Sequence, residues 1–166
     1  TGTLTEGSFE VQKIEPANGA ATDQILALAA SLERHSTHPV AKAILSYANG
    51  QELTEAQDVQ EIPGRGLKGV MSGDQVLAGN LKLMEEHNVQ VSQTEEDDPS
   101  TFVYVASGGQ HLGPIHIADR IKPDTVQALK DLRELGVKKL IMLSGDNEKT
   151  TRFMADKMGL TDAYGG

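Results

Sequence analysis

The chain has 166 residues, of which 38% are hydrophobic, so it is long enough for one ordinary domain or two small ones with a buried core. Its 15 basic and 24 acidic side chains give a net charge of -9 at pH 7, which opposes nonspecific binding to nucleic acid or anionic lipid. The chain has no cysteine, which excludes disulfides and thiolate metal sites. It also has no apolar run of the roughly 18 residues that a membrane span needs. We therefore expect a soluble chain that is not inserted in a membrane.

A strand is predicted near Phe9, followed by two helices that the polar block SLERHSTHP separates. The apolar helix faces consist of Ile25, Leu28, Ala29 and Leu32 in the first helix and of Val40, Ile44 and Tyr47 in the second. Pro39 fits the first position of a helix, and Ser36 or Thr37 could cap it. Glu33 and His38 then lie on a corner where both could face one ligand.

Several short strands follow the two helices. DVQEI runs into PGRG, and LKGVM and QVLAG form a predicted hairpin that turns at residues 72–74. Asn80 can cap a short helix, and residues 94–100 are expected to form a solvated loop. TFVYVAS and HLGPIHIAD form another predicted hairpin around Gly108 and Gly109. This part of the chain is therefore predicted to be an antiparallel α+β unit.

The pattern changes after Asp119. Pro123 can open a helix that Gly136 closes, and the apolar face of this helix is Val126, Leu129, Leu132 and Leu135. KKLIML lacks alternation, which predicts a strand buried on both faces, and a helix with Phe153, Met154 and Met158 follows. This order is typical of a doubly wound parallel sheet, where ligands bind beyond the carboxyl ends of strands, here at residues 144–147.

Each candidate motif also has a purely structural explanation. SGDN could bind phosphate at a helix start, or Ser144 or Asp146 could simply cap that helix. The GRG segment could let a flat ligand approach the backbone closely, or it could form a hairpin or bulge. His38 alone is more often a turn or capping residue, and Glu33 alone is more often a solvated helix residue. Neither His35 nor His87 has a partner pattern that predicts a zinc site.

The order of these motifs resembles that of the heavy-metal-transporting P-type ATPases. The similar segments are TGTLTEG, SLERHSTHPVAKAI, GRGLKG with AGN, DRIKPD and MLSGDN, and they cover nearly the whole chain. TGTLTEG is similar to the family's phosphorylation motif D-K-T-G-T-L-T without its first two residues. The dipeptide His38-Pro39 marks the metal-transporting branch.

The resemblance implies a nucleotide-binding domain at residues 9–112, inserted into a phosphorylation domain of α/β haloacid-dehalogenase-like, Rossmann-like fold at residues 1–8 and 113–166. Carried over by motif, six residues would serve the nucleotide: Glu33, His38, Gly64, Gly66, Gly79 and Asn80. Glu33 and His38 would contact adenine, against an apolar wall that Leu67 and Val70 could supply. Gly66→Val is then expected to block nucleotide binding and to leave most of the fold intact, unless Gly66 has a positive φ.

The phosphates would meet Ser144, Gly145 and Asp146, with Thr1 following the phosphorylated Asp. That Asp would precede Thr1, and a later Mg²⁺-holding segment would follow Gly166, so this chain is expected to bind ATP or ADP without forming a phospho-enzyme. The resemblance further implies a cytoplasmic part of an integral membrane protein, with the transporter's other domains as partners and no oligomer of this part.

Two alternatives remain open from the sequence. A soluble haloacid-dehalogenase-like phosphatase with an inserted cap domain would explain TGTLTEG and SGDN, although it would leave SLERHSTHP and GRG unexplained. A non-catalytic module could instead bind a partner protein through its acidic surface, and it would have no affinity for nucleotide.

Overall fold

The computed structural model describes residues 2–91, 101–145 and 148–166, and the chain divides into two compact units. One, the sheet unit, comprises Phe9–Thr94 and Thr101–Ala118; the other, the α/β unit, comprises Thr1–Ser8, Glu95–Ser100 and Asp119–Gly166. The second boundary falls after Ala118 rather than after residue 112, within the strand that runs from Gln110 to Ile121. The loop predicted at residues 94–100 lies outside the described residues, as do Thr1 and Asp146.

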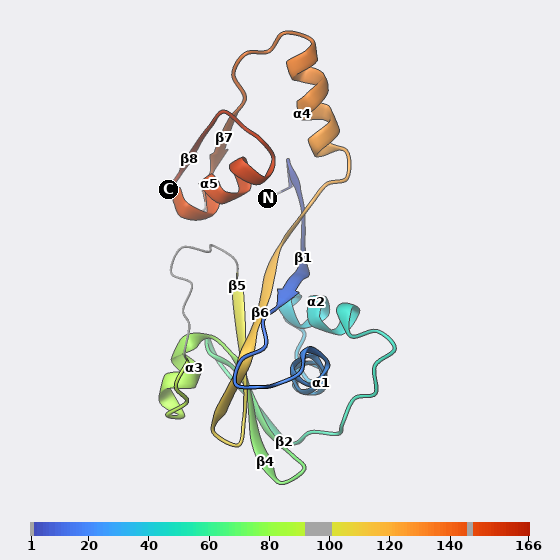
Figure 1. The fold of residues 1–166 in the computed structure, drawn as a ribbon, viewed down its shortest axis with the longest axis vertical. Coiled ribbons are helices and arrows are strands. Elements are labelled where there is room, and N and C mark those ends of the chain that lie inside the picture. Colours follow the sequence, from blue (N-terminus) through green and yellow to red (C-terminus); the bar gives the residue numbers. More distant parts are fainter. Residues whose placement is uncertain (1, 92–100, 146–147) are drawn as a thin grey trace. The chain divides into compact units, whose positions relative to one another are not determined.

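Six strands form the sheet of the first unit, in the order β1-β6-β5-β4-β3-β2 (Figure 1). They are β1 (Thr5–Ile14), β2 (Gln57–Ile62), β3 (Gly66–Met71), β4 (Asp74–Gly79), β5 (Thr101–Ser107) and β6 (Gln110–Ile121). Strands β2 to β6 pair antiparallel, and both predicted hairpins are confirmed. In the β3–β4 hairpin Ser72 and Gly73 have φ of 52° and 88°, which is the backbone that a tight two-residue turn requires.

Helices cover both faces of this sheet. They are α1 (Thr22–Glu33), α2 (Pro39–Tyr47) and α3 (Leu81–Glu86). Because side chains alternate along a strand, Val76 and Ala78 of β4 pack in the core with α1 and α2, whereas Leu77 packs on the opposite face with α3. The short helix and its cap at Asn80 are confirmed.

The predicted apolar face of α1 is confirmed, since Ile25, Ala29 and Leu32 are fully buried. In α2, however, Tyr47 is 53% exposed, so its inclusion in the buried face is wrong. It is the last residue of the helix, whereas the buried residues of α2 all lie within its first six positions: Val40, Ala41, Ala43 and Ile44.

The α/β unit contains α4 (Thr125–Glu134), β7 (Ile141–Ser144), α5 (Glu148–Lys157) and β8 (Asp162–Gly165). The parallel pairing of β7 with β8 agrees with the predicted parallel sheet, although β8 itself is not predicted. Its core is formed by Met142, Met154, Ala155, Met158 and Ala163. Gly136 has a φ of +96° just after α4, as expected of a left-handed helix end.

The prediction that β7 is buried on both faces is wrong for this chain. Leu143 is 78% exposed and Ile141 is 51% exposed, whereas Met142 between them is buried. Side chains of a strand alternate, and among the described residues only the face of Met142 is covered. The helix α4 is also less buried than its pattern predicts, since Val126 is 52% and Leu132 is 41% exposed, and Leu135 just after the helix is 82% exposed.

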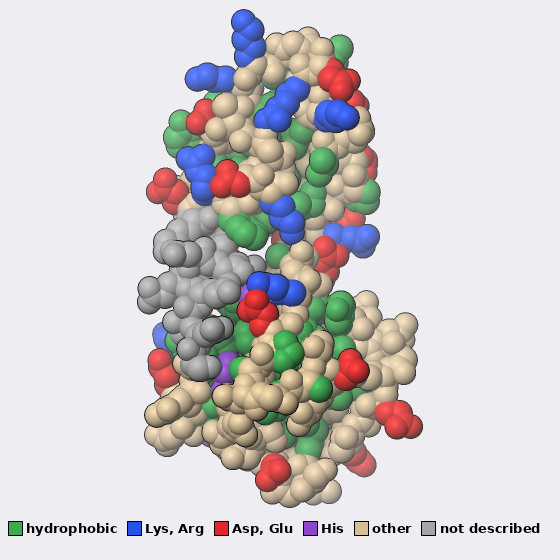
Figure 2. All heavy atoms as spheres, viewed as in Figure 1, with side chains coloured by type: hydrophobic (Ala, Val, Ile, Leu, Met, Phe, Trp, Pro, Cys, Tyr) green, Lys and Arg blue, Asp and Glu red, His purple; other side chains and the backbone are tan. Residues whose placement is uncertain are grey.

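Charged side chains are distributed over the surface. On the face that Figure 2 shows, Asp and Glu are scattered singly rather than gathered in one patch, and most of the Lys and Arg side chains in view lie on the α/β unit. Within the described ranges, no helix combines the length and the apolar character that crossing a membrane requires.

Candidate functional site

The corner between α1 and α2 is built around His38. This residue has an extended backbone and caps α2, because its Nδ1 accepts a hydrogen bond from the backbone N–H of Val40 at 3.2 Å. The expectation that Ser36 or Thr37 caps the helix is therefore wrong: Ser36 Oγ instead accepts the N–H of His38 at 3.2 Å. Since Nδ1 is an acceptor, the neutral imidazole carries its proton on Nε2, which leaves one ring donor for a ligand.

On the strand side of the site, two glycines face each other across β3 and β4. Gly66 and Gly79 are register partners. A Cβ at Gly66, whose φ is +141°, would overlap the carbonyl oxygen of Ala78 and the Cα of Gly79. Gly64 differs from Gly66 in that a Cβ there would meet open space. Only its φ of +70° favours glycine. Close approach of two backbones thus accounts for the glycines at 66 and 79.

Asn80 uses both ends of its side-chain amide within the protein. Its Oδ1 accepts the backbone N–H of Leu83 at 3.1 Å, which caps α3, and its Nδ2 donates to the carbonyl oxygen of Gly64 at 2.8 Å. Asn80 therefore holds the Gly64–Gly66 segment against the start of α3. Asn80 would affect a ligand by fixing the position of that segment.

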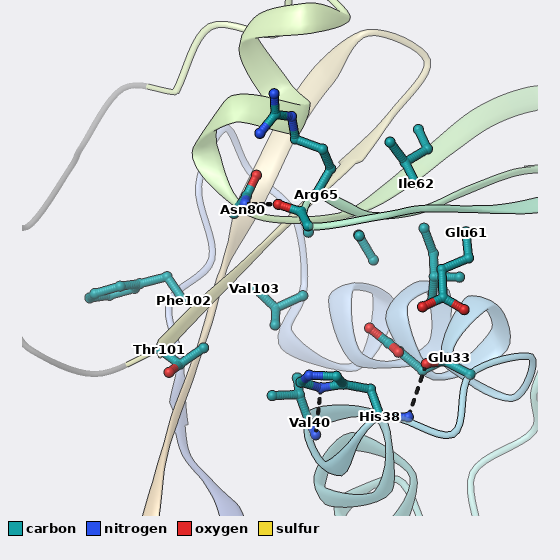
Figure 3. Close-up of a pocket in the computed structure, with 16 residues that line it drawn as sticks. Glu33, His38, Val40, Glu61, Ile62, Arg65, Asn80, Thr101, Phe102 and Val103 are labelled. Carbon is teal, nitrogen blue, oxygen red and sulfur yellow. Dashed lines mark hydrogen bonds between the residues drawn. The ribbon is translucent and has the colours of Figure 1, made fainter. Parts of the chain in front are cut away.

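These two sides enclose a pocket of about 230 Å³ within the sheet unit (Figure 3). All six residues that the resemblance assigns to nucleotide line it: Glu33, His38, Gly64, Gly66, Gly79 and Asn80. Leu67 also lines it, as predicted, but Val70 does not. The two lie three residues apart on β3, and an odd spacing in a strand places side chains on opposite faces.

The sequence interpretation missed part of the pocket. Val40 and Ile62 add apolar surface, and Val103 does so from β5. The preceding Phe102 points away from His38 in Figure 3, as expected from the alternation of a strand. The alternation of β5 could have shown that Val103 faces α1 and α2, but only the sheet order could show that β5 lies beside β4 at this pocket.

Glu33 is a predicted member of the site, but its burial was not predicted. Its side chain is buried, with the residue only 6% exposed, so the interpretation as a solvated helix residue is wrong. Burial, reinforced by the nearby Glu61 carboxylate, raises the pKa of Glu33 from 4.5 to about 7. The carboxyl group can therefore gain or lose a proton near neutral pH.

The predicted phosphate residues lie in the other unit. Ser144 ends β7 and is partly buried, and Gly145 follows it with open space where a Cβ would lie. The other two predicted phosphate residues, Asp146 and Thr1, lie outside the described residues. Among the side chains that the structure describes, no three His, Asp or Glu are arranged to hold a metal ion.

The whole chain, residues 1–166, matches the family model of the haloacid dehalogenase-like hydrolases. It is 40% identical over 165 residues to the cadmium, zinc and cobalt-transporting ATPase of Bacillus subtilis (strain 168), covering 99% of this chain and 23% of that protein. The chain thus spans about a quarter of the length of the curated relatives it matches.

Solved structures give the same result. A zinc-transporting PIB-type ATPase in the E2.Pi state aligns with a TM-score of 0.82 and 30% identity, covering 100% of this chain and 28% of that one. The catalytic domain of the CPx-ATPase CopB-B, from a study of conformational changes upon nucleotide binding, aligns with a TM-score of 0.68 and 29% identity, covering 99% of this chain and 58% of that one. The resemblance to heavy-metal P-type ATPases is confirmed, and the chain belongs to the haloacid dehalogenase-like hydrolase family.

Proposed function

We propose that the sheet unit binds ATP or ADP, with the adenine ring in the pocket between α1, α2 and the strands β3 and β4. The observation that carries this proposal is that six residues from separate segments, each assigned to nucleotide by its motif, line one pocket. Modest affinity is expected, with dissociation constants from micromolar to millimolar, or about -8 to -4 kcal/mol.

The chemistry of the pocket suits a purine base. Val40, Leu67 and Val103 offer apolar surface to the faces of the ring, and the Nε2–H of His38 can donate to a ring nitrogen. A volume of about 230 Å³ lies below the roughly 300 to 1,000 Å³ of pockets that enclose a whole drug-sized ligand. We therefore place the base inside and the ribose and phosphates outside.

For the longer protein to which such a segment would belong, we propose ATP-driven transport of a heavy-metal cation through an aspartyl-phosphate. The names of the relatives and the motif TGTLTEG support this proposal. Ser144, Gly145 and Asp146 would contact the transferred phosphate, with Thr1 close by, and Mg²⁺ would neutralise its charge when bound with the nucleotide. This chain would then be cytoplasmic and monomeric, and would work with the transporter's other domains.

The two alternative functions are less well supported. A soluble phosphatase with a cap domain needs neither the capped His38 corner nor the Gly66–Gly79 contact that together shape the pocket. An acidic interaction module needs no pocket at all. ATP binding by the isolated chain distinguishes the proposed function from both, and the nucleotide binding named for the CopB-B domain favours it.

The variant His38→Asn tests the role of the corner. Asparagine is a good N-cap, so the variant keeps the start of α2 but removes the Nε2 donor. We expect ATP affinity to fall by about two- to tenfold, the loss of one hydrogen bond of about 0.5 to 1.5 kcal/mol, with the melting temperature nearly unchanged. Calorimetric titration and thermal unfolding on the same sample measure both quantities.

His35→Asn is the matched control, because His35 is exposed on the same turn and does not line the pocket. It should leave ATP affinity unchanged. Normal ATP affinity in the His38 variant would remove this residue from the site, and no measurable binding of ATP by the unmodified chain would refute the proposed function.

A further inference from the structure

Two carboxyl groups meet in the pocket from different elements. Glu33 is the last residue of α1, and Glu61 comes from β2 on the opposite side of the pocket. Figure 3 shows both carboxyl groups turned toward the space between these elements. Within the described ranges, neither carboxyl group has an ion-pair or hydrogen-bond partner, which is unusual for a group as buried as Glu33.

The other charged groups around Glu33 leave Glu61 as its main electrostatic neighbour. From α2 comes His38, whose Nδ1 is engaged with Val40. From the β2–β3 turn comes Arg65, whose Nε donates to Glu86 of α3 at 2.9 Å. Among the described residues, β4 and β5 contribute no titratable side chain to the lining. The negative charge of Glu61 is the one that acts on the Glu33 carboxyl group and helps raise its pKa.

The protonation state of Glu33 decides which purine edge it matches. A neutral carboxyl group offers one donor and one acceptor, whereas a carboxylate offers only acceptors. The edge of adenine presents the N6 amino donor beside the N1 acceptor, so it pairs with the neutral group. The edge of guanine presents the N1–H and N2–H donors, so it pairs with the carboxylate.

We propose that Glu61, acting through Glu33, sets the preference of this pocket for adenine over guanine nucleotides. Glu61 is a positioning residue: its charge keeps the proton on Glu33 and so preserves the donor that adenine needs. The inference rests on the proposed nucleotide site. It is consistent with a Glu33 pKa of about 7, at which both forms of the group are populated at neutral pH.

The test compares ATP and GTP affinities of the whole chain between pH 6 and pH 8.5. The quantity compared is the GTP dissociation constant divided by the ATP dissociation constant. Because both nucleotides carry the same triphosphate, this ratio cancels the titration of the phosphates. In the unmodified protein this ratio should favour ATP most strongly at low pH and should fall as the pH rises through about 7. In Glu61→Gln the fall should occur at lower pH, so that the ratio at pH 7 is about two- to fivefold smaller.

Two further variants separate this role from a structural one. Glu33→Gln presents a donor and an acceptor at every pH, so its ratio should not depend on pH, and adding Glu61→Gln to it should change nothing more. Glu55→Gln removes an exposed carboxylate outside the pocket and should behave as the unmodified protein does. A Glu61→Gln ratio equal to that of the unmodified protein at every pH would overturn the inference alone, whereas no binding of ATP would overturn the proposed function with it.

Discussion

The two walls of the pocket differ in what their polar and backbone groups are used for. On the glycine wall, Gly66 and Gly79 are explained by backbone contact, and both ends of the Asn80 amide are bonded within the protein. On the helix wall, Glu33 is buried without a partner among the described residues and His38 keeps one ring nitrogen free of its cap. Residues of one motif set can thus line a pocket with groups that the fold itself uses, as on the glycine wall, or with groups that the fold leaves available, as on the helix wall.

The largest effect is expected on the glycine wall. Even the methyl group of Gly66→Ala would overlap backbone atoms and would have an unfavourable φ, so we expect a loss of about 2 to 5 kcal/mol in the free energy of unfolding. Gly66→Val should lose more, and the expectation that it leaves the fold intact is abandoned because Gly66 has a φ of +141°. Urea unfolding measures the difference.

Gly73→Ala is the matched control for this prediction. Gly73 also has a positive φ, but a Cβ there would meet open space, so only the backbone cost of about 1 to 2 kcal/mol should appear. Equal losses at both positions would mean that the close contact between β3 and β4 contributes nothing.

On the helix wall, Glu33→Gln should increase stability, and the gain should depend on pH. The pKa of Glu33 is raised from 4.5 in the unfolded chain to about 7 in the folded protein. The protonated group therefore contributes its full stabilisation of the folded state below pH 4.5. This stabilisation is lost as the pH rises through about 7. Above that pH the ionised group costs the folded state at most about 3 kcal/mol. Glu33→Gln should therefore raise the free energy of unfolding at pH 8 by up to that amount, with little change at pH 5.

Urea unfolding of both proteins at the two pH values checks the sign and the size. Glu52→Gln, at an exposed position, should show no such dependence. If Glu33→Gln were destabilising at pH 8, the buried carboxylate would have a stabilising partner, and the contrast between the two walls would fail.

A smaller effect is expected for Asn80→Ala, which removes the cap of α3 and the bond to Gly64. The expected loss is about 1 to 2 kcal/mol in the free energy of unfolding. Asn80→Ser can still cap the helix but cannot reach Gly64 as the amide does, so it should lose about half as much. If either variant lost ATP affinity while its stability stayed unchanged, Asn80 would belong to the ligand-facing residues instead.

Local patterns predicted most of the elements. The apolar faces of α1, the cap of α3 by Asn80 and the tight turn at Ser72 and Gly73 each depend on residues near one another in the chain. The errors concern burial. Tyr47 and Leu143 fit an apolar pattern, yet both are exposed, because a pattern shows which face is apolar and not whether a neighbouring element covers it. The strand β8 carries too short a signal, DAYG, to be predicted.

The sequence by itself determined the order of the elements, the family resemblance and the six candidate residues of the pocket, since each follows from local spacing or from a motif. Only the tertiary structure decided what these residues do there. The burial of Glu33 and the influence of Glu61 on it arise because the end of α1 and β2 line one pocket, and the need for glycine at 66 and 79 arises where β3 meets β4. Burial, electrostatic neighbours and backbone overlap depend on segments far apart in the chain, and no local pattern contains them.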